Sequence, residues 1–282
     1  MSYEEIGFQI ADKVSDLTKF SEICISLGCD GGYIAKYISK DKLGVLLQCD
    51  MSEGFVRRSN SAPGSQIPVL SVVADEELVP FKSHCADLIV SNLSAHWIND
   101  LPNWFSRCFS ILREDCPFIG AVLAGDTLQE LRISLQLAES ERLGGIGAHI
   151  SPFLMPQDVG SLMSRAGFQM ITLDSDRIEI GYPNMFALLY DLQSMGESNA
   201  TNRRNCHLRR DILVAADAIY KAMFAENNAY PATFQVVSFI GWKPGSNVPK
   251  LAKRGSQNVS FKDLSKYASG EKPLPFQGHE EV

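Results

Sequence analysis

A glycine-rich turn with an acidic side chain separates two apolar segments near the start of the sequence. Residues 23–27 are apolar enough to form a buried strand, and they lead directly into Gly28-Cys29-Asp30-Gly31-Gly32. Because glycine has no Cβ, the backbone of such a turn can approach a ligand closely, and a helix that begins there offers unpaired N–H groups to polar atoms. We therefore expect Gly28, Cys29, Asp30 and Gly32 to bind a ligand.

A carboxylate ends the second apolar segment, which covers residues 44–50. Asp50 lies 22 residues after Gly28, close to the spacing at which an acidic side chain binds both hydroxyls of a ribose. Dinucleotide-binding turns place their glycines at i, i+2 and i+5, whereas here the spacing is i, i+3 and i+4, which argues against a pyrophosphate. The two segments predict a strand–helix–strand unit with a helix of about ten residues, and we expect Asp50 and the adjacent Met51 to contact the ligand.

Polar residues also follow the next two predicted strands. Asp75 and Glu76 come after the strand expected at 68–73, and Ser91 ends the strand expected at 86–91. In an open parallel sheet the ligand lies at the carboxyl ends of the strands, so these three side chains are candidates for the same site. Asp75 could accept a hydrogen bond from the exocyclic amine of an adenine, or it could cap the next helix.

Two residues near the same edge of the sheet are candidates for catalysis, His96 and Asp126. His96 follows the fourth strand and could act as a base or contact the substrate, or it could pack the start of a helix. Asp126 follows the strand expected at 117–124, and it could bind a cationic substrate together with Arg132 or cap the helix that begins there. If the acidic side chains near this edge converge, they favour a basic substrate such as an arginine. They are Asp50, Asp75, Glu76, Asp126 and Glu197.

Two further segments are candidates for the substrate side of the site. The loop at 143–149 contains three glycines and could act as a lid, and we expect His149 on it to be exposed to solvent. The polar segment 195–199 could line the mouth of the site, or it could end a helix at Gly196.

Composition limits the class of protein. With 282 residues and 45% hydrophobic content, the chain is long enough for one large α/β domain with a buried core. A formal net charge of −7 and a pI near 5.3 argue against nucleic acid as a partner. The seven cysteines form no CxxC pair, so we expect free thiols and no zinc site. The spacing typical of iron oxygenases occurs only at His279-Glu280-Glu281, and we predict no metal.

The apolar segments are no longer than strands, so no membrane-spanning helix is expected. The sequence begins with Met1-Ser2-Tyr3-Glu4-Glu5, which is acidic where a targeting peptide would be basic. This pattern predicts either a cytosolic protein or one whose presequence is absent from this chain.

Periodicity and composition divide the chain into an N-terminal helix, an α/β domain and a polar tail that we expect to be largely disordered. These three parts cover residues 1–20, 21–242 and 243–282. The last two strands of the domain are expected at 168–174 and 233–242. Helical material at 177–230 is expected to interrupt the pairing of these strands and to cover the substrate.

Three segments after the glycine turn resemble, in order, motifs of the class I S-adenosylmethionine (SAM) methyltransferases of the biotin and ubiquinone pathways. They are ADEELVPF (74–81), CADLIVSNLSAHW (85–97) and ILREDCPFIG (111–120). The resemblance implies a Rossmann-like α/β fold with a seven-stranded, mostly parallel sheet, helices on both faces and a helical insertion before the last strand. It also implies SAM as the cofactor, with the glycine turn as the first motif and Asp50 as the acid that binds the ribose.

Later segments carry a closer resemblance, which covers nearly the whole chain from Tyr3 to about Lys266. GDTLQELRISLQLAESER (125–142), YPNMFALLYDLQSMGESN (182–199) and PATFQVVSFIGWKP (231–244) are similar to the family of mitochondrial NADH dehydrogenase (complex I) assembly factor five. This resemblance implies a protein-arginine hydroxylase, with methyl transfer as a further activity, that acts on the iron–sulfur subunit adjoining the quinone site of complex I. It further implies a protein on the matrix side of the mitochondrial inner membrane, peripheral to it, with a small twin-CX9C assembly factor as a partner.

Two residues depart from the family pattern at the glycine turn. Ser26 stands where an acid is usual, and Asp30 stands where a glycine is usual. Aspartate tolerates the left-handed backbone better than most residues but adds bulk where a close approach is needed, so we expect weakened affinity for SAM. Two alternatives stay open, a small-molecule methyltransferase of the biotin or ubiquinone kind and a non-catalytic assembly chaperone with a degenerate SAM pocket.

Overall fold

One seven-stranded sheet organises the part of the chain that the structure describes. The computed structural model describes residues 3–29, 31–60, 64–151, 153–198, 208–227 and 229–246, so Asp30, His279 and most of the predicted tail lie outside the described residues. The strands are β1 (Ser21–Leu27), β2 (Leu43–Asp50), β3 (Val69–Val73), β4 (Leu88–Asn92), β5 (Pro117–Leu123), β6 (Gln169–Tyr182) and β7 (Tyr230–Trp242).

The strand order is β3-β2-β1-β4-β5-β7-β6. Strands β1 to β5 pair in parallel, and β7 runs antiparallel to both of its neighbours. The predicted α/β class with a seven-stranded, mostly parallel sheet is therefore confirmed.

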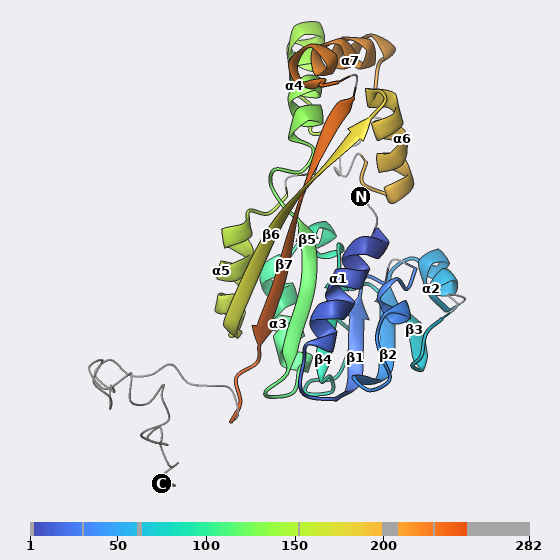
Figure 1. Cartoon of the computed structure of the whole chain (residues 1–282). Helices are drawn as coiled ribbons and strands as arrows, with labels where there is room; N and C mark the ends of the chain where they lie inside the picture. The colour runs from blue at the N-terminus through green and yellow to red at the C-terminus, as the bar shows by residue number, and fades with distance from the viewer. Residues whose placement is uncertain are drawn as a thin grey trace, which may run out of the picture. The chain divides into compact units, whose positions relative to one another are not determined.

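Both faces of the central strands are covered, which explains their nearly continuous apolar sequences. On one face, helix α1 (Tyr3–Ser15) packs Ile6, Ile10 and Val14 onto the sheet. On the other face lie α3 (Leu101–Ile111) and α5 (Pro156–Ala166), which contribute Trp104, Phe105 and Met163 to a second apolar cluster. Figure 1 shows α1 in front of the sheet and α3 behind it. Burying each of these large side chains stabilises the fold by about 1.5–3 kcal/mol.

The connection between β1 and β2 differs from the prediction. Instead of a helix of ten residues, the described chain forms one 3-10 turn, η1 (Ile34–Lys36). A helix must fix several residues before its first hydrogen bond forms, and only a short stretch separates Gly32 from Ser39, where the hydroxyl accepts a hydrogen bond from the N–H of Asp41. The predicted helix is wrong, and with it the expectation that a helix N-terminus presents N–H groups to the ligand.

The last two strands also differ from the prediction. Strand β6 continues to Tyr182, and its pairing with β7 extends without a break from Thr172↔Ile240 to Tyr182↔Tyr230. The expectation of helical material from residue 177 onward, interrupting this pair, is therefore wrong. Arg177-Ile178-Glu179-Ile180 alternates polar and apolar side chains with the period of a strand, which is the signal that was missed.

Three helices lie around the C-terminal end of β6 and the N-terminal end of β7 (Figure 1). The helices α4 (Gln129–Leu143), α6 (Met185–Met195) and α7 (Arg210–Phe224) share a third apolar cluster there with residues of both strands. Tyr220 at the centre of this cluster is fully buried, and its hydroxyl donates to the carbonyl of Pro231. This cluster holds the helices to the strands that pass beneath them.

The first residue of the predicted disordered tail belongs to the folded part. Lys243 is buried, and its Nζ donates to the carbonyl oxygens of Phe109 and Leu112 at 2.8 Å each. The chain divides into the units Met1–Ser246 and Asn247–Val282, and all described residues belong to the first. Among the described residues, none of the helices is both long and apolar enough to cross a membrane.

Candidate functional site

The glycine turn after β1 is shaped by close contacts that only glycine permits. Gly28 has a φ of +72°, and a Cβ at this position would lie 2.2 Å from the Cβ of Ser94. Gly31 and Gly32 also have positive φ values, and they pack against Arg58 and Ser59 of α2 (Glu53–Asn60). The turn therefore lies between the start of η2 (Ala95–Trp97) and the end of α2.

The carboxylate of Asp50 contacts this turn. Asp50 is only 7% exposed, and its two oxygens accept hydrogen bonds from the N–H of Cys29 at 3.1 Å and of Ser52 at 2.8 Å. A carboxylate oxygen has two lone pairs and can accept more than one hydrogen bond. Met51, the next residue, is 70% exposed at the same edge of the sheet.

Glu76 supplies a second acid next to the glycine turn. Its Oε1 accepts from the hydroxyl of Ser94 at 2.9 Å and lies 3.7 Å from the position of a Cβ on Gly28. Burial raises the pKa of Glu76 above its usual value. The hydrogen bond from Ser94 lowers this pKa, and the nearby charge of Asp50 raises it further. The Oε2 of Glu76 is buried without a hydrogen-bond partner among the described residues, as is the Oγ of Ser91.

Asp75, by contrast, is exposed and closes a tight turn. Its Oδ1 accepts from the N–H of Glu77 at 2.9 Å. The residues after it form a turn and not a helix, so the predicted helix cap is wrong at this position.

His96 forms a buried pair with Glu197, a residue 101 positions away. Its Nε2 lies 2.8 Å from Oε1 of Glu197, and the two side chains are only 1% and 4% exposed. The same Oε1 accepts from the hydroxyl of Tyr3 at 3.0 Å and from Nε1 of Trp97 at 3.2 Å. Phe153 lies edge-on to the imidazole ring, with 5.6 Å between ring centroids. We call these five residues the Glu197 cluster.

Glu197 is a charged carboxylate within this cluster. Burial alone would raise the pKa of Glu197, but the hydrogen bond and charge of His96 and the hydrogen bonds from Tyr3 and Trp97 together lower it. Gly196 ends α6 with a φ of +78°, so the segment is a helix end and also a source of polar contacts. Nδ1 of His96 is buried and has no hydrogen-bond partner among the described residues.

A pocket of about 270 Å³ adjoins this cluster. It lies beyond the carboxyl end of β4, and its lining includes His96, Trp97, Ile98, Asn99, Ser151 and Leu154. We call it the His96 pocket. One predicted catalytic residue, His96, thus lines a pocket. This pocket lies past the carboxyl ends of the strands, where Glu76 and Ser91 are found.

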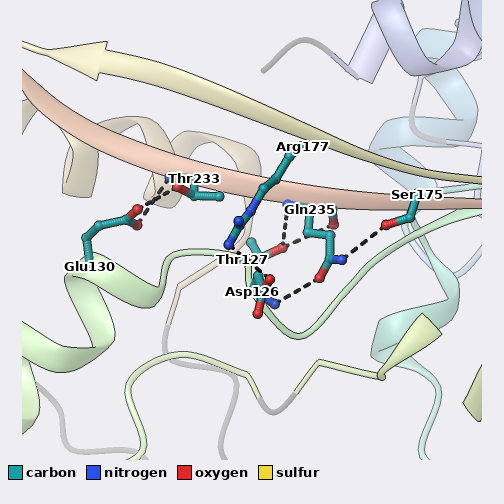
Figure 2. A network of polar contacts seen from close by, with 7 residues as sticks. All are labelled: Asp126, Thr127, Glu130, Ser175, Arg177, Thr233 and Gln235. Atoms are coloured by element: carbon teal, nitrogen blue, oxygen red, sulfur yellow. Dashed lines mark hydrogen bonds and ion pairs between the residues drawn. The ribbon is translucent and has the colours of Figure 1, made fainter. Parts of the chain in front are cut away.

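Asp126 does not cap the helix that follows it. Its Oδ2 pairs with Nη2 of Arg177 at 3.0 Å, and its N–H donates to the side chain of Gln235 at 3.1 Å (Figure 2). The residue that caps α4 is Leu128, which has a φ of +54° and no side-chain cap bond. Asp50 and Glu76 lie close enough for the charge of one to affect the other, whereas Asp126 pairs with a residue of β6, so the convergence of all five acids stays a prediction.

Hydrogen bonds hold the loop after α4 to that helix. Nε2 of His149 bonds to Oε1 of Glu139, and the other oxygen of Glu139 accepts from the N–H of Gly147. The side chain of His149 is 13% exposed, so the expectation of solvent exposure is wrong. Arg132 donates to the carbonyl of Ser151 at 3.0 Å and also holds this loop.

Sequence reasoning missed three residues of the site. Ser94, Tyr3 and Phe153 contact predicted site residues, and neither their residue types nor their spacing indicates these contacts. Tyr3 is 194 positions from Glu197, and no local pattern could pair them. Among the described residues, no three His, Cys, Asp or Glu side chains lie together as a metal site would require.

The comparisons with known proteins agree with this geometry. A family model described as a methyltransferase domain matches residues 25–119, which contain the glycine turn, Asp50 and His96. With the sheet order above, this match defines a protein of the class I SAM-methyltransferase fold.

Arginine-hydroxylase NDUFAF5, mitochondrial, of Homo sapiens is 47% identical over 264 residues, which cover 93% of this chain and 76% of the human protein. The relative of the same name from Danio rerio is also 47% identical, over 93% of this chain and 81% of its own length. The chain therefore belongs to the mitochondrial arginine-hydroxylase NDUFAF5 family.

More distant proteins share the architecture. Malonyl-[acyl-carrier protein] O-methyltransferase of Methylovorus sp. is 27% identical, over 83% of this chain and 79% of its own length. The solved structure of the YcgJ protein of Bacillus subtilis superposes with a TM-score of 0.57 at 12% identity, over 84% of this chain and 98% of that one. At such low identity the second likeness shows the fold alone.

Proposed function

We propose that this protein hydroxylates an arginine side chain of a protein substrate during the assembly of complex I. The observation that carries the proposal is the 47% identity to human arginine-hydroxylase NDUFAF5 over 93% of the chain. The substrate proposed is the iron–sulfur subunit adjoining the quinone site, and methyl transfer is proposed as a further activity of the same fold.

The residues around the glycine turn fit SAM as a cofactor. Glu76 Oε2 and Ser91 Oγ are buried polar atoms without partners among the described residues, and such atoms normally bind a polar group. We propose that Asp50 accepts from the ribose hydroxyls and Glu76 from the adenine amine, while Gly28, Cys29 and Gly32 allow a close approach. SAM, when bound, would supply an electrophilic methyl group. Asp30 keeps its predicted place in this site but lies outside the described residues.

The substrate side is proposed at the His96 pocket. His96 and the carboxylate of Glu197 lie there, and the acceptor atoms of this pair suit a basic side chain such as arginine. Asp126 is left out of the proposed site because its carboxylate pairs with Arg177.

The proposed location is the matrix side of the mitochondrial inner membrane. It is supported by relatives that are named mitochondrial. A peripheral association with the membrane and a small twin-CX9C assembly partner complete the proposal.

A small-molecule methyltransferase is the second candidate. It is favoured by the 27% identity to malonyl-[acyl-carrier protein] O-methyltransferase over 83% of the chain. The size of the His96 pocket argues against it, because about 270 Å³ is below the roughly 300–1,000 Å³ typical of pockets for whole small ligands.

One experiment distinguishes an arginine hydroxylase from a methyltransferase and from a chaperone. The chain, with a mitochondrial presequence added, is expressed in cells from which the native relative has been deleted, and the iron–sulfur subunit is analysed by tandem mass spectrometry. We expect an arginine with one added oxygen atom, which is absent in cells that carry the empty vector. An arginine that gains a methyl group instead would identify a methyltransferase, and restored complex I without either modification would identify a chaperone.

A further inference from the structure

The His96 pocket combines an unused hydrogen-bond acceptor with negative charge behind its wall. Nδ1 of His96 is buried and has no hydrogen-bond partner among the described residues. An unsatisfied buried polar atom costs free energy, so an atom of this kind in a native fold normally serves a ligand. His96 is one of the residues that line the His96 pocket.

Glu197 determines what Nδ1 can bind. Its buried carboxylate lies 2.8 Å from Nε2, so the proton of a neutral imidazole sits on Nε2 and donates to Glu197. A neutral imidazole carries its proton on one nitrogen and a lone pair on the other. In the neutral ring Nδ1 is an acceptor, and its partner must be a donor.

The charges around the pocket favour a cationic donor. None of the described residues that line it carries a fixed charge. Two carboxylates bond to lining residues from outside the pocket: Glu197 bonds to His96 and Trp97, and Glu77 accepts from the backbone and side chain of Asn99. Hydrogen bonds from Asn99 lower the pKa of Glu77 and keep it ionised. Both carboxylates attract a cation to this space, and the guanidinium of Arg132, which donates to the carbonyl of the lining residue Ser151, opposes this attraction.

The size and lining of the pocket suit a single flat side chain. A volume of about 270 Å³ is too small for a whole drug-sized ligand. Trp97 is 39% exposed, and its indole can stack on a guanidinium group, which is planar and weakly hydrated. Arginine combines five N–H donors, a fixed positive charge and a flat shape.

We propose that the His96 pocket binds the guanidinium group of the substrate arginine, with Nδ1 of His96 as an acceptor and Glu197 as the positioning residue that orients the ring. This inference rests on the proposed function and deepens it, since it assigns the substrate side chain to a particular pocket. Glu197 acts through His96.

The test uses the full chain labelled with ¹⁵N-histidine and two probes, N-acetyl-arginine amide and its neutral analogue N-acetyl-citrulline amide. We expect the free protein to show His96 with a protonated Nε2 and an unprotonated Nδ1, and the arginine probe to shift the Nδ1 resonance. The citrulline probe, which lacks the charge, should bind about tenfold more weakly or worse, as expected for the loss of a charged hydrogen bond.

Two variants separate the roles of the ring nitrogens. His96→Gln can keep a donor to Glu197 but removes the acceptor at Nδ1, and we expect at least about a tenfold loss of arginine affinity with an unchanged melting temperature. Glu197→Gln keeps the shape and removes the charge, and we expect it to alter the His96 tautomer and to weaken the binding of the arginine probe more than that of the citrulline probe.

The outcome is independent of the hydroxylation assay. An arginine probe that leaves Nδ1 unshifted, or His96→Gln that hydroxylates the protein substrate with unchanged KM, would overturn this inference and leave the proposed hydroxylase intact. Probe binding at Nδ1 without any arginine hydroxylation would support the pocket and reject the proposed activity.

Discussion

The carboxylate of Glu76 suits the proposed ligand but lowers the stability of the protein without ligand. Its carboxylate is buried beside Gly28, and one oxygen has no partner among the described residues. Burial raises the pKa of Glu76 in the folded state. Between the unfolded and folded pKa values the folded chain binds more protons than the unfolded chain, so its stability falls as pH rises through this range.

Glu76→Gln should therefore stabilise the protein without ligand at neutral pH. We expect a gain of about 1 kcal/mol, or roughly 2 to 4 °C in Tm. The gain should disappear at pH 4, below both pKa values, because the native side chain is then protonated as well. Thermal unfolding from pH 4 to 7.5 measures this, with the exposed Glu53→Gln as the matched control. Equal Tm values for the wild type and Glu76→Gln at neutral pH would contradict the argument.

A substitution at Gly28 tests whether close packing or the left-handed backbone makes glycine necessary in this turn. Gly28→Ala places a Cβ 2.2 Å from that of Ser94 at a φ of +72°, whereas Gly144→Ala has a similar φ of +68° and nothing within 4 Å. We expect about 1 kcal/mol of destabilisation at Gly144 from the left-handed backbone alone, and about 3 kcal/mol at Gly28 because overpacking adds to it.

Urea unfolding of both variants gives these values directly. Adding Ser94→Gly to Gly28→Ala should recover part of the loss, since it removes the colliding side chain. Equal losses at the two glycines would show that the contact with Ser94 relaxes without cost.

At the scale of elements, the sequence predicted the strands better than their connections. The strands β1, β4 and β5 are mostly apolar, and the glycine turn and Asp50 mark the ends of β1 and β2, so local pattern was sufficient. The helix expected after the turn was wrong because the segment before Ser39 is too short to nucleate one.

The candidate site was predictable only where it lies on strand ends. Asp50, Glu76 and Ser91 follow strands of a parallel sheet, so topology alone brings them to one edge. The pairing of His96 with Glu197 depends on how α6 packs, and it joins residues 101 positions apart. Asp126 follows a strand in the same way, yet the unexpectedly long β6 brings Arg177 to its carboxylate.

Lys243 gives a prediction for helix α3. Its ammonium group donates to the carbonyls of Phe109 and Leu112 at the end of this helix and lies 4.8 Å from the centre of the Phe109 ring. Lys243→Met keeps the apolar stem but leaves both carbonyls without this donor, so we expect a loss of about 1–3 kcal/mol in the free energy of unfolding. Lys221→Met, at an exposed position on α7, should change it by less than about 0.5 kcal/mol.

Urea unfolding and amide hydrogen exchange check this prediction together. The amides in the last turn of α3 should exchange faster in Lys243→Met than in the wild type, because the cap of that turn is gone. A variant with unchanged stability would mean that water replaces the ammonium group at both carbonyls.

At the scale of the whole molecule, the Glu197 cluster joins four parts of the chain, one of which is the segment between α4 and α5 that carries Phe153. Tyr3 comes from the first helix, His96 and Trp97 from the sheet edge, and Glu197 from the end of α6. The Glu197 cluster, which adjoins the His96 pocket, is therefore complete only when these parts have folded together. The glycine turn and Asp50 are closer in the chain, and besides β1 and β2 the turn contacts the end of α2 and Ser94.

SAM should stabilise the whole fold if the proposed cofactor site works. A ligand that binds only the folded state at 100 times its Kd adds about 2.7 kcal/mol to the free energy of unfolding. We expect this gain for the wild type and the loss of most of it in Asp50→Asn, because the amide nitrogen that replaces one carboxylate oxygen cannot accept a hydrogen bond from the backbone or from a ribose hydroxyl. Asp41→Asn, at an exposed position in the same strand connection, is the control and should keep the full gain. Differential scanning calorimetry with increasing SAM measures the effect. An equal gain in Asp50→Asn would place SAM elsewhere, and no gain in the wild type at millimolar SAM would favour an assembly chaperone that has kept the fold without its cofactor.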